Sequence, residues 1–241
     1  MRLPIIEGVI RRRILVNFRV GPRVIKRLLP SRFRPKLHAG HAVAGICMIR
    51  LAHIRPRGFP EFVGIHSENA AHRIAVLWDD ADGTTHEGVF ITRRDTDSQL
   101  NCWLGGRLFP GEHHKATFDV VEASAGVTVS VKSRDRAVEI DVAGCVCETL
   151  PSTSIFSTLA ESSAFFESGS LGYSVTRDPH RLDGITLKTH QWQVRPLEIS
   201  HIQSSYFADE TLFPPGSAEF DHALLMKDVR HEWHAAADFC V

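Results

Sequence analysis

Four consecutive ionisable side chains, Glu112-His113-His114-Lys115, form the segment of this sequence that is best equipped for catalysis. The segment follows a turn rich in glycine and proline, and the apolar pattern predicts a strand from Ala116 onward. Alternate side chains of a strand share a face, so His113 and Lys115 would point to one side and His114 to the other. On an apolar side, desolvation would lower the pKa of a lysine, and a neutral amine can form a Schiff base with a carbonyl compound. At a solvated loop edge the same residues would be inert, and their spacing leaves both interpretations open.

A second polar pair, Glu68-Asn69, interrupts an apolar stretch that has the pattern of a strand. A carboxylate that faces the interior of a sheet could move protons for a lysine, and Glu68 or Glu112 is the candidate for that role. Other cationic residues could bind an acidic ligand or could equally lie on the surface. These are His72, Arg73 and Arg107.

The common signatures of nucleotide, serine-hydrolase and zinc chemistry are missing from the sequence. There is no glycine-rich dinucleotide loop and no phosphate loop that ends in Gly-Lys-Ser/Thr. Residues 168–172 (SGSLG) place their glycines out of register with a hydrolase nucleophile elbow, and residues 231–234 (HEWH) fall one residue short of the zincin pattern. We therefore expect no metal and no cofactor.

Length and composition favour one ordinary globular domain over residues 1–241, with 43% hydrophobic and 23% charged residues. The five cysteines are odd in number and scattered, which indicates reduced thiols in a cytoplasmic protein, and we interpret them as buried or incidental. No apolar run approaches the roughly 20 residues of a membrane-spanning helix, and the start lacks the apolar core of a secretory signal. We expect a cytoplasmic protein with no membrane partner, and the sequence leaves homo-oligomerisation open.

Charge is distributed unevenly along the chain despite the net charge of zero. The first 57 residues hold 14 Lys and Arg and one acid, Glu7, while the rest holds 14 basic and 27 acidic residues. Such a split could mark a nucleic-acid or protein interaction surface, which would gather Arg11, Arg12, Arg13, Arg23 and Arg27 on one side. Because these residues alternate with apolar ones, pairing of basic early strands with acidic later strands is the favoured interpretation, and nucleic acid is not the expected partner.

Periodicity predicts a mainly β protein with a few short helices. Strands are expected over residues 14–20, 41–52, 65–79, 84–93, 127–131, 137–147, 172–176, 185–195 and 197–205, with a hairpin turn at Asp-Ala-Asp-Gly, residues 80–83. Short helices are expected after Pro22, over residues 98–104, and after a cap at Ser154 or Ser157. Residues 219–233 fit a strand and a helix equally well. About ten strands with few helices favour a barrel or stacked sheets.

The order of these segments resembles an uncharacterised bacterial family, the YqjF-like family of the acetoacetate decarboxylase-like superfamily. The likeness rests on the helix end Leu28-Leu29-Pro30, on the loop Ile54-Arg55-Pro56-Arg57-Gly58-Phe59-Pro60, on Glu68-Asn69, on Gly88-Val89-Phe90, and on Gly106-Arg107 before Phe109-Pro110. It is best over residues 14–120. The resemblance implies a cone-shaped antiparallel β-barrel with a central cavity. In the decarboxylase branch, a lysine just after a Gly-Phe-Pro-like turn forms a Schiff base, a second lysine beside it lowers its pKa, and a strand glutamate assists.

Carried over by position, Glu68 matches the strand glutamate, Arg107 the arginine before the turn, and Pro110 the turn proline. The twin lysines are absent: His113 stands near the nucleophile's place, and Lys115 lies two residues further along. The resemblance therefore implies a small-molecule-binding barrel for an organic acid or carbonyl compound, with the ligand itself unknown. The alternative is a Schiff-base lyase of decarboxylase or aldolase type, with Lys115 and Glu68 catalytic. The substrate-binding candidates are Arg107, His113, Glu112 and Asn69.

Overall fold

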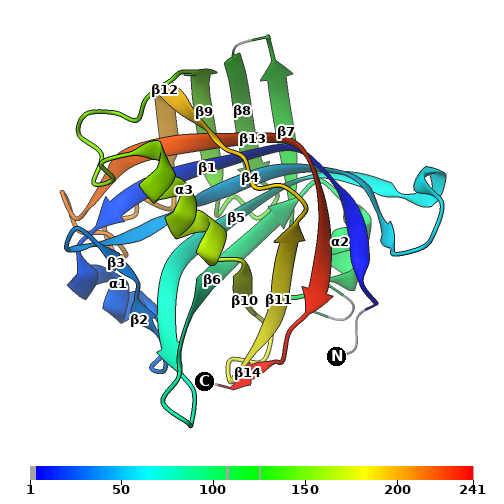
Figure 1. Cartoon of the computed structure of the whole chain (residues 1–241), viewed down its shortest axis with the longest axis horizontal. Helices are drawn as coiled ribbons and strands as arrows, with labels where there is room; N and C mark the ends of the chain where they lie inside the picture. The colour runs from blue at the N-terminus through cyan, green and yellow to red at the C-terminus, as the bar shows by residue number, and fades with distance from the viewer. Residues whose placement is uncertain (1–3, 107–108, 125, 241) are drawn as a thin grey trace.

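Five long strands form the centre of the fold: β1 (Ile6–Val20), β4 (His41–Pro56), β5 (Ile65–Asp79), β6 (Thr85–Thr96) and β13 (Ala218–Ala235). The computed structural model describes residues 4–106, 109–124 and 126–240 (Figure 1). The shorter strands are β2 (Arg34–Pro35), β3 (Leu37–His38), β7 (His114–Glu122), β8 (Gly126–Ser133), β9 (Glu139–Val146), β10 (Leu171–Val175), β11 (Arg181–Thr189), β12 (Arg195–Ser204) and β14 (Phe239–Cys240). The helices are α1 (Pro22–Leu28), α2 (Gln99–Leu104) and α3 (Leu159–Ser168), with a 3-10 turn at Glu61–Val63.

The strands pair into two closed rings that share β13, β1, β4, β5 and β6 in that order. On its second edge, β6 pairs with β10 through residues 89–91 and with β7 through residues 95–96. Likewise, β13 pairs with β12 through residues 223–225 and with β11 through residues 231–235. The smaller ring is therefore completed by β10 and β11, and the larger ring by β7, β8, β9 and β12. In Figure 1, β10 and β11 lie at the bottom, and β7, β8, β9 and β12 lie at the top.

Alternation along the shared strands sends successive side chains to different cores. Ile14 and Val16 of β1 pack in one hydrophobic cluster with β8 and β9, whereas Leu15 belongs to a second cluster that includes Phe166 of α3. All of these side chains are less than 9% exposed. Because β1 is buried on both faces, its sequence is a nearly continuous apolar run between its arginines.

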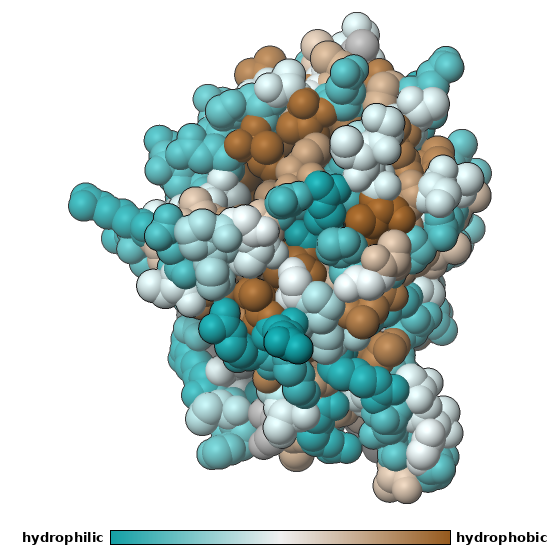
Figure 2. All heavy atoms as spheres, turned by 90° about the vertical axis from the view of Figure 1, so that its left-hand side faces the viewer, coloured by the Kyte–Doolittle hydropathy of each residue, from teal (hydrophilic) through white to brown (hydrophobic). Residues whose placement is uncertain are grey.

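Surface polarity varies over the side of the molecule seen in Figure 2. Hydrophobic patches there are interrupted by hydrophilic side chains among the residues drawn in colour. This side therefore offers no continuous apolar face of the kind that marks a large obligate interface. Within the described ranges, no helix combines the length and apolar character needed to cross a bilayer.

The mainly β architecture expected from the sequence is confirmed. The turn at residues 80–83 joins β5 to β6, with Gly83 at φ +84°, a conformation that favours glycine. The undecided segment 219–233 is strand β13. The predicted helix caps at Ser154 or Ser157 are wrong: Thr158 caps α3 by accepting a hydrogen bond from the Glu161 amide, while the Glu161 carboxylate accepts from the Ser157 amide. These two hydrogen bonds place the N-cap one residue after Ser157.

Candidate ligand-binding site

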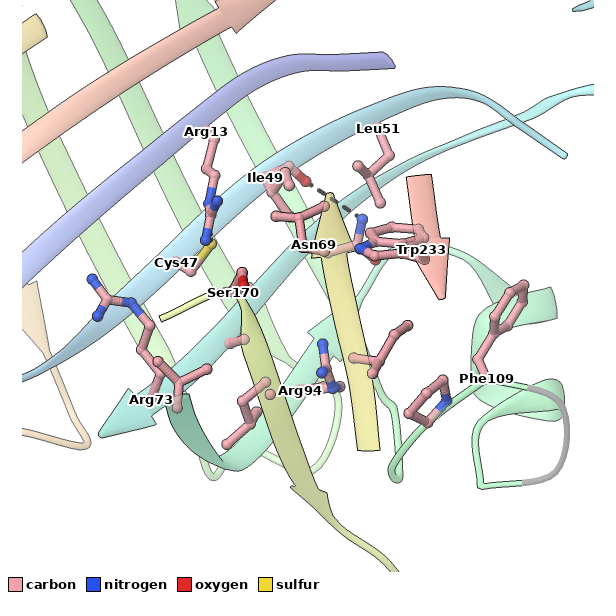
Figure 3. A pocket seen from close by; sticks show the side chains of 18 of the residues that line it. Arg13, Cys47, Ile49, Leu51, Asn69, Arg73, Arg94, Phe109, Ser170 and Trp233 are labelled. Atoms are coloured by element: carbon pink, nitrogen blue, oxygen red, sulfur yellow. Dashed lines mark hydrogen bonds between the residues drawn. The ribbon is translucent and has the colours of Figure 1, made fainter. Parts of the chain in front are cut away.

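A pocket of about 480 Å³ opens inside the smaller ring (Figure 3). Its floor comes from β1, β4, β5 and β6, and the other walls come from α3, β10, β11 and the residues around Trp192 and Trp233. Aliphatic side chains such as Leu51 and Ile91 line it together with the rings of Phe109 and Phe166. A cavity of this size and apolar character is typical of sites for small organic molecules.

Three arginines of three different strands line this apolar pocket: Arg13 of β1, Arg73 of β5 and Arg94 of β6. Burial lowers the pKa of Arg73 and of Arg94 to about 10, so both guanidinium groups stay charged at neutral pH. The acidic residues on the described lining are Asp95 and Glu167. Asp95 already accepts hydrogen bonds from Arg93, and Glu167 is exposed. Among the described residues, no ion pair joins Arg13, Arg73 or Arg94 to a carboxylate; Asp183 interacts electrostatically with Arg94 but forms its ion pair with Arg181.

The strand registers explain how these side chains come to share one floor. Cys47 of β4 lies opposite Ala71 of β5, which lies opposite Arg94 of β6. Two residues along, Asn17 of β1 lies opposite Gly45, and Gly45 lies opposite Arg73.

A Cβ on Gly45 would meet the Val16 carbonyl oxygen at 2.2 Å, so only glycine fits there. The missing side chain lets Asn17 and Arg73 meet across β4, where Arg73 Nη2 donates to Asn17 Oδ1 at 2.5 Å.

Each arginine is oriented by a different set of contacts. Arg13 donates from Nε to Cys47 Sγ at 3.3 Å and lies over the ring of Trp192 at 5.6 Å. Arg73 lies over the ring of Phe166 at 4.9 Å. Arg94 donates from Nε and Nη2 to the hydroxyl oxygen of Ser174, at 3.1 and 2.9 Å. Two nitrogens, Arg13 Nη1 and Arg73 Nε, are buried and have no hydrogen-bond partner among the described residues. Such N–H groups are free to bind an anion.

A buried polar chain continues from Arg73 away from the pocket. Asn17 Nδ2 lies 3.1 Å from His222 Nε2, and His222 Nδ1 lies 2.5 Å from Asp221 Oδ2. With Asn17 donating to Nε2 and Nδ1 donating to Asp221, each of these two contacts joins a donor to an acceptor. Ser162 Oγ also lies 2.8 Å from Nε2, which completes a Ser-His-Asp arrangement. All three of its side chains are at most 2% exposed, so a substrate cannot reach Ser162, and the arrangement is structural.

Besides Arg73, two of the residues singled out in the sequence lie on the pocket, Asn69 and His113. Asn69 donates from Nδ2 to the Ile49 carbonyl at 3.4 Å and to Ser67 Oγ at 2.9 Å (Figure 3). Burial, aided by Arg94, lowers the pKa of His113 to about 3, so its ring is neutral at physiological pH. Neutral His113 and the Asn69 amide can orient a polar ligand without adding charge.

The other predicted residues lie elsewhere. Lys115 lies on β7 of the larger ring, is absent from the described pocket lining, and donates from Nζ to the Asp97 carbonyl. Glu68 accepts a 2.6 Å hydrogen bond from the buried Arg12, and burial raises the pKa of this carboxyl. Glu112 forms an ion pair with Arg177 at 3.6 Å. Arg107 lies outside the described residues. The expected common face of His113 and Lys115 does not form, because β7 begins at His114 and strand alternation does not extend back to His113.

Arg13, Cys47 and Arg94 were missed as site residues by sequence reasoning. The signal that could have found them is a charged residue within an apolar strand, as at Arg73 in AAHRIAV. Of the five arginines of the alternative interaction surface, Arg11, Arg12 and Arg13 do not share one side of the molecule. Arg11 is exposed, Arg12 is fully buried, and Arg13 lines the pocket. Alternation separates Arg12 from Arg13, and the irregular register between Ile10 and Arg12 separates Arg11 from Arg13. Among the described residues, no group of three or more His, Cys, Asp or Glu side chains could hold a metal ion.

Comparison with solved structures identifies the fold. Acetoacetate decarboxylase from Legionella pneumophila superposes with a TM-score of 0.64 at 11% identity, over 98% of this chain and 89% of that one. An acetoacetate decarboxylase-like enzyme from Sphingomonas wittichii RW1 gives 0.57 at 11% identity, over 100% and 94%. The enduracididine biosynthesis enzyme MppR, in complex with pyruvate, gives 0.57 at 9% identity, over 100% and 91%. At these identities the likeness shows the fold alone.

Comparison of the sequence itself gives the family. No curated protein matches it. One family model, DUF2071, matches residues 9–229 and is described as an uncharacterized conserved protein (COG2071). That match covers more than half of the chain and agrees with the resemblance inferred from the sequence. The chain belongs to the DUF2071 family, with the fold of the acetoacetate decarboxylase-like proteins.

Proposed function

We propose that this protein binds a small organic acid that has an apolar body, with the carboxylate held by the arginines of the pocket. The observation that carries the proposal is the presence of Arg13, Arg73 and Arg94 on one apolar-walled cavity, where none of them forms an ion pair with a carboxylate of the described residues. A guanidinium group presents N–H donors in a planar fork that matches a carboxylate, and a partly dry site strengthens that interaction. The rings of Trp192 and Trp233 supply apolar surface for the rest of the ligand.

A titration with phenylacetate and phenylacetamide tests this proposal, because the two compounds have nearly the same size and differ in charge. The acid should raise the melting temperature and bind measurably, while the amide should do neither at the same concentration. Arg94→Gln should weaken binding of the acid by about tenfold or more, since hydrogen bonds to charged groups contribute roughly 1.5–3 kcal/mol. Arg11→Gln is the matched control, because Arg11 lies exposed on the same strand as Arg13 and pairs with Asp228. Equal binding of acid and amide would contradict the proposal.

A second candidate function is a lyase that forms a Schiff base, which the kinship with decarboxylase-fold proteins supports. In that case Lys115 would be the nucleophile and Glu68 its proton-transfer partner. The lysine would first have to leave the Asp97 carbonyl and reach the pocket. Binding of an organic acid requires no such rearrangement and is therefore the preferred function. A cytoplasmic location is part of the proposal and is supported by the five free cysteines.

A further inference from the structure

The thiol of Cys47 lies inside the pocket and in contact with its positive charge. Cys47 is 9% exposed and lines the cavity from β4. Its sulfur accepts a hydrogen bond from Arg13 Nε at 3.3 Å (Figure 3). Arg73 and Arg94 both interact electrostatically with it as well. The sulfur therefore lies beside a guanidinium group that can bind an anion.

The same cluster also has vacant hydrogen-bond donors, which is independent evidence that a ligand can bind beside the sulfur. Arg73 is only 5% exposed and lines the pocket, yet its Nε has no partner among the described residues. Arg13 Nη1, on the guanidinium group that contacts Cys47, is also buried and has no partner among the described residues. A buried, charged N–H group without an acceptor is costly unless a ligand supplies one. An anion that bound there would lie within reach of the sulfur.

We propose that Cys47 is a reactive thiol which is covalently modified by carboxylic acids that carry an electrophilic carbon next to the carboxylate. The arginines bind the carboxylate, and this places the adjacent carbon at Sγ. With a 2-halo acid, the S–C bond forms as the carbon–halogen bond breaks, the halide leaves with the bonding electrons, and the thiol proton passes to solvent. No further reactant is required. The inference rests on the proposed function only in that the pocket must admit anions.

The chain contains an internal reference for this reactivity. Cys145 is an exposed thiol on β9, and its opposite residue across the β9–β12 pair is Glu198. Access to Cys145 is therefore easier than access to Cys47, but its neighbouring charge is negative. A reagent that is guided by positive charge should favour Cys47, and one that is guided by exposure should favour Cys145.

Iodoacetate and iodoacetamide separate these two cases, because they alkylate thiols in the same way and differ in charge. Rates at each cysteine are measured in the folded protein by peptide mapping and mass spectrometry. We expect the ratio of the iodoacetate rate to the iodoacetamide rate to be about tenfold or more higher at Cys47 than at Cys145, as a positively lined cleft concentrates anions. Arg13→Gln should bring the ratio at Cys47 toward that at Cys145, and Arg11→Gln should leave it unchanged. An equal or lower ratio at Cys47 in the wild-type protein, or reaction of Cys47 only after unfolding, would overturn the inference without reference to any variant.

This outcome can be told apart from failure of the proposed function. If phenylacetate binds and phenylacetamide does not, while Cys47 shows no preference for iodoacetate, the pocket binds acids but its thiol is not a reactive site. If Cys47 prefers iodoacetate while phenylacetate does not bind, the reactive thiol stands and the proposed binding function fails.

Discussion

Arg73 and Asn17 lie on strands that do not pair with each other, yet they form a 2.5 Å hydrogen bond across Gly45 of the strand between them. This contact connects the pocket to the buried pair His222 and Asp221. His222 Nδ1 lies against Asp221, and His222 Nε2 faces the Asn17 amide nitrogen. The Asn17 oxygen therefore faces Arg73. Asn17 is a positioning residue for Arg73, although it does not itself line the pocket.

Replacing Asn17 with leucine should destabilise the protein and weaken acid binding. The change leaves the buried Nη2 of Arg73 without its acceptor, which costs about 2–4 kcal/mol for a charged group. Urea unfolding gives the stability, and titration with phenylacetate gives the affinity. Asn101→Ala is the control, because Asn101 is a buried amide at the same pocket whose 3.4 Å contacts do not include Arg73. Unchanged affinity in a folded Asn17→Leu protein would show that Arg73 keeps its position without Asn17.

Replacing Arg12 with methionine should cost about 2–4 kcal/mol, the lower part of the range for a broken buried ion pair because both partner carboxylates are partly exposed. Arg12 is fully buried and donates to Glu68 and Glu122, each at 2.6 Å. Burial already raises the pKa of Glu68, and loss of Arg12 removes an opposing cause, so protonation becomes still more favourable in the folded state. The stability deficit should therefore shrink as the pH falls. The double variant Arg12→Met/Glu68→Gln should recover part of the loss at neutral pH, and no recovery would show that the charge of Glu68 is not responsible.

His72 should make the protein less stable in mild acid. It is fully buried with both ring nitrogens unpartnered among the described residues, and burial, aided by Arg93, lowers its pKa to about 3. Between the unfolded pKa of about 6.5 and this value, the unfolded chain binds a proton that the folded protein does not, so stability falls as the pH falls. From pH 7.5 to 5 this amounts to about 2 kcal/mol. Urea unfolding at both pH values should show a decrease smaller by that amount in His72→Phe, whose ring can pack against Tyr206. An identical decrease would exclude His72 as a source.

Lys115 should be dispensable for acid binding, because it bonds to the Asp97 carbonyl and is absent from the described pocket lining. Lys115→Met should therefore leave the affinity for phenylacetate unchanged within about twofold, or 0.4 kcal/mol. Borohydride trapping with acetoacetate and other keto acids, followed by peptide mapping, tests the alternative chemistry. A reduced adduct on Lys115 that is lost in Lys115→Met would establish Schiff-base formation and make the lyase the better function.

Much of the fold could be predicted because local signals and tertiary structure agree. The Asp-Gly turn gave β5 and β6, and the apolar run after Ala39-Gly40 gave β4. The start of α3 was misplaced because several hydroxyl residues in PSTSIFST can act as caps, and only the Glu161 carboxylate selects Thr158. The two rings could not be predicted, because a linear pattern does not indicate that β6 and β13 change partners along their length.

The site was harder to predict than the fold. Sequence reasoning gave weight to Lys115 and Glu68, which are conspicuous as charges but are held by Asp97 and Arg12. The pocket depends instead on the registers that place Arg13, Cys47 and Arg94 on one face, and a register follows from pairing between distant strands. Arg73 was recognised as a cation that could bind an acidic ligand, but its partner Asn17 lies 56 residues earlier in the chain. A contact between residues so far apart cannot be recognised from the local sequence pattern.

Because β6 and β13 change partners along their length, one part of the sheet encloses the pocket and another part encloses a hydrophobic core. Residues 159–189, which include α3, β10 and β11, form one wall of the pocket and complete the smaller ring, whereas β7, β8, β9 and β12 hold the core of the larger ring. One wall of the pocket is therefore carried by a single continuous segment of the chain, residues 159–189. Transplanting this segment from one family member to another would replace the ligand-facing wall and, with Phe166 and Ser174, the contacts that orient Arg73 and Arg94, while the arginines themselves stay on β1, β5 and β6.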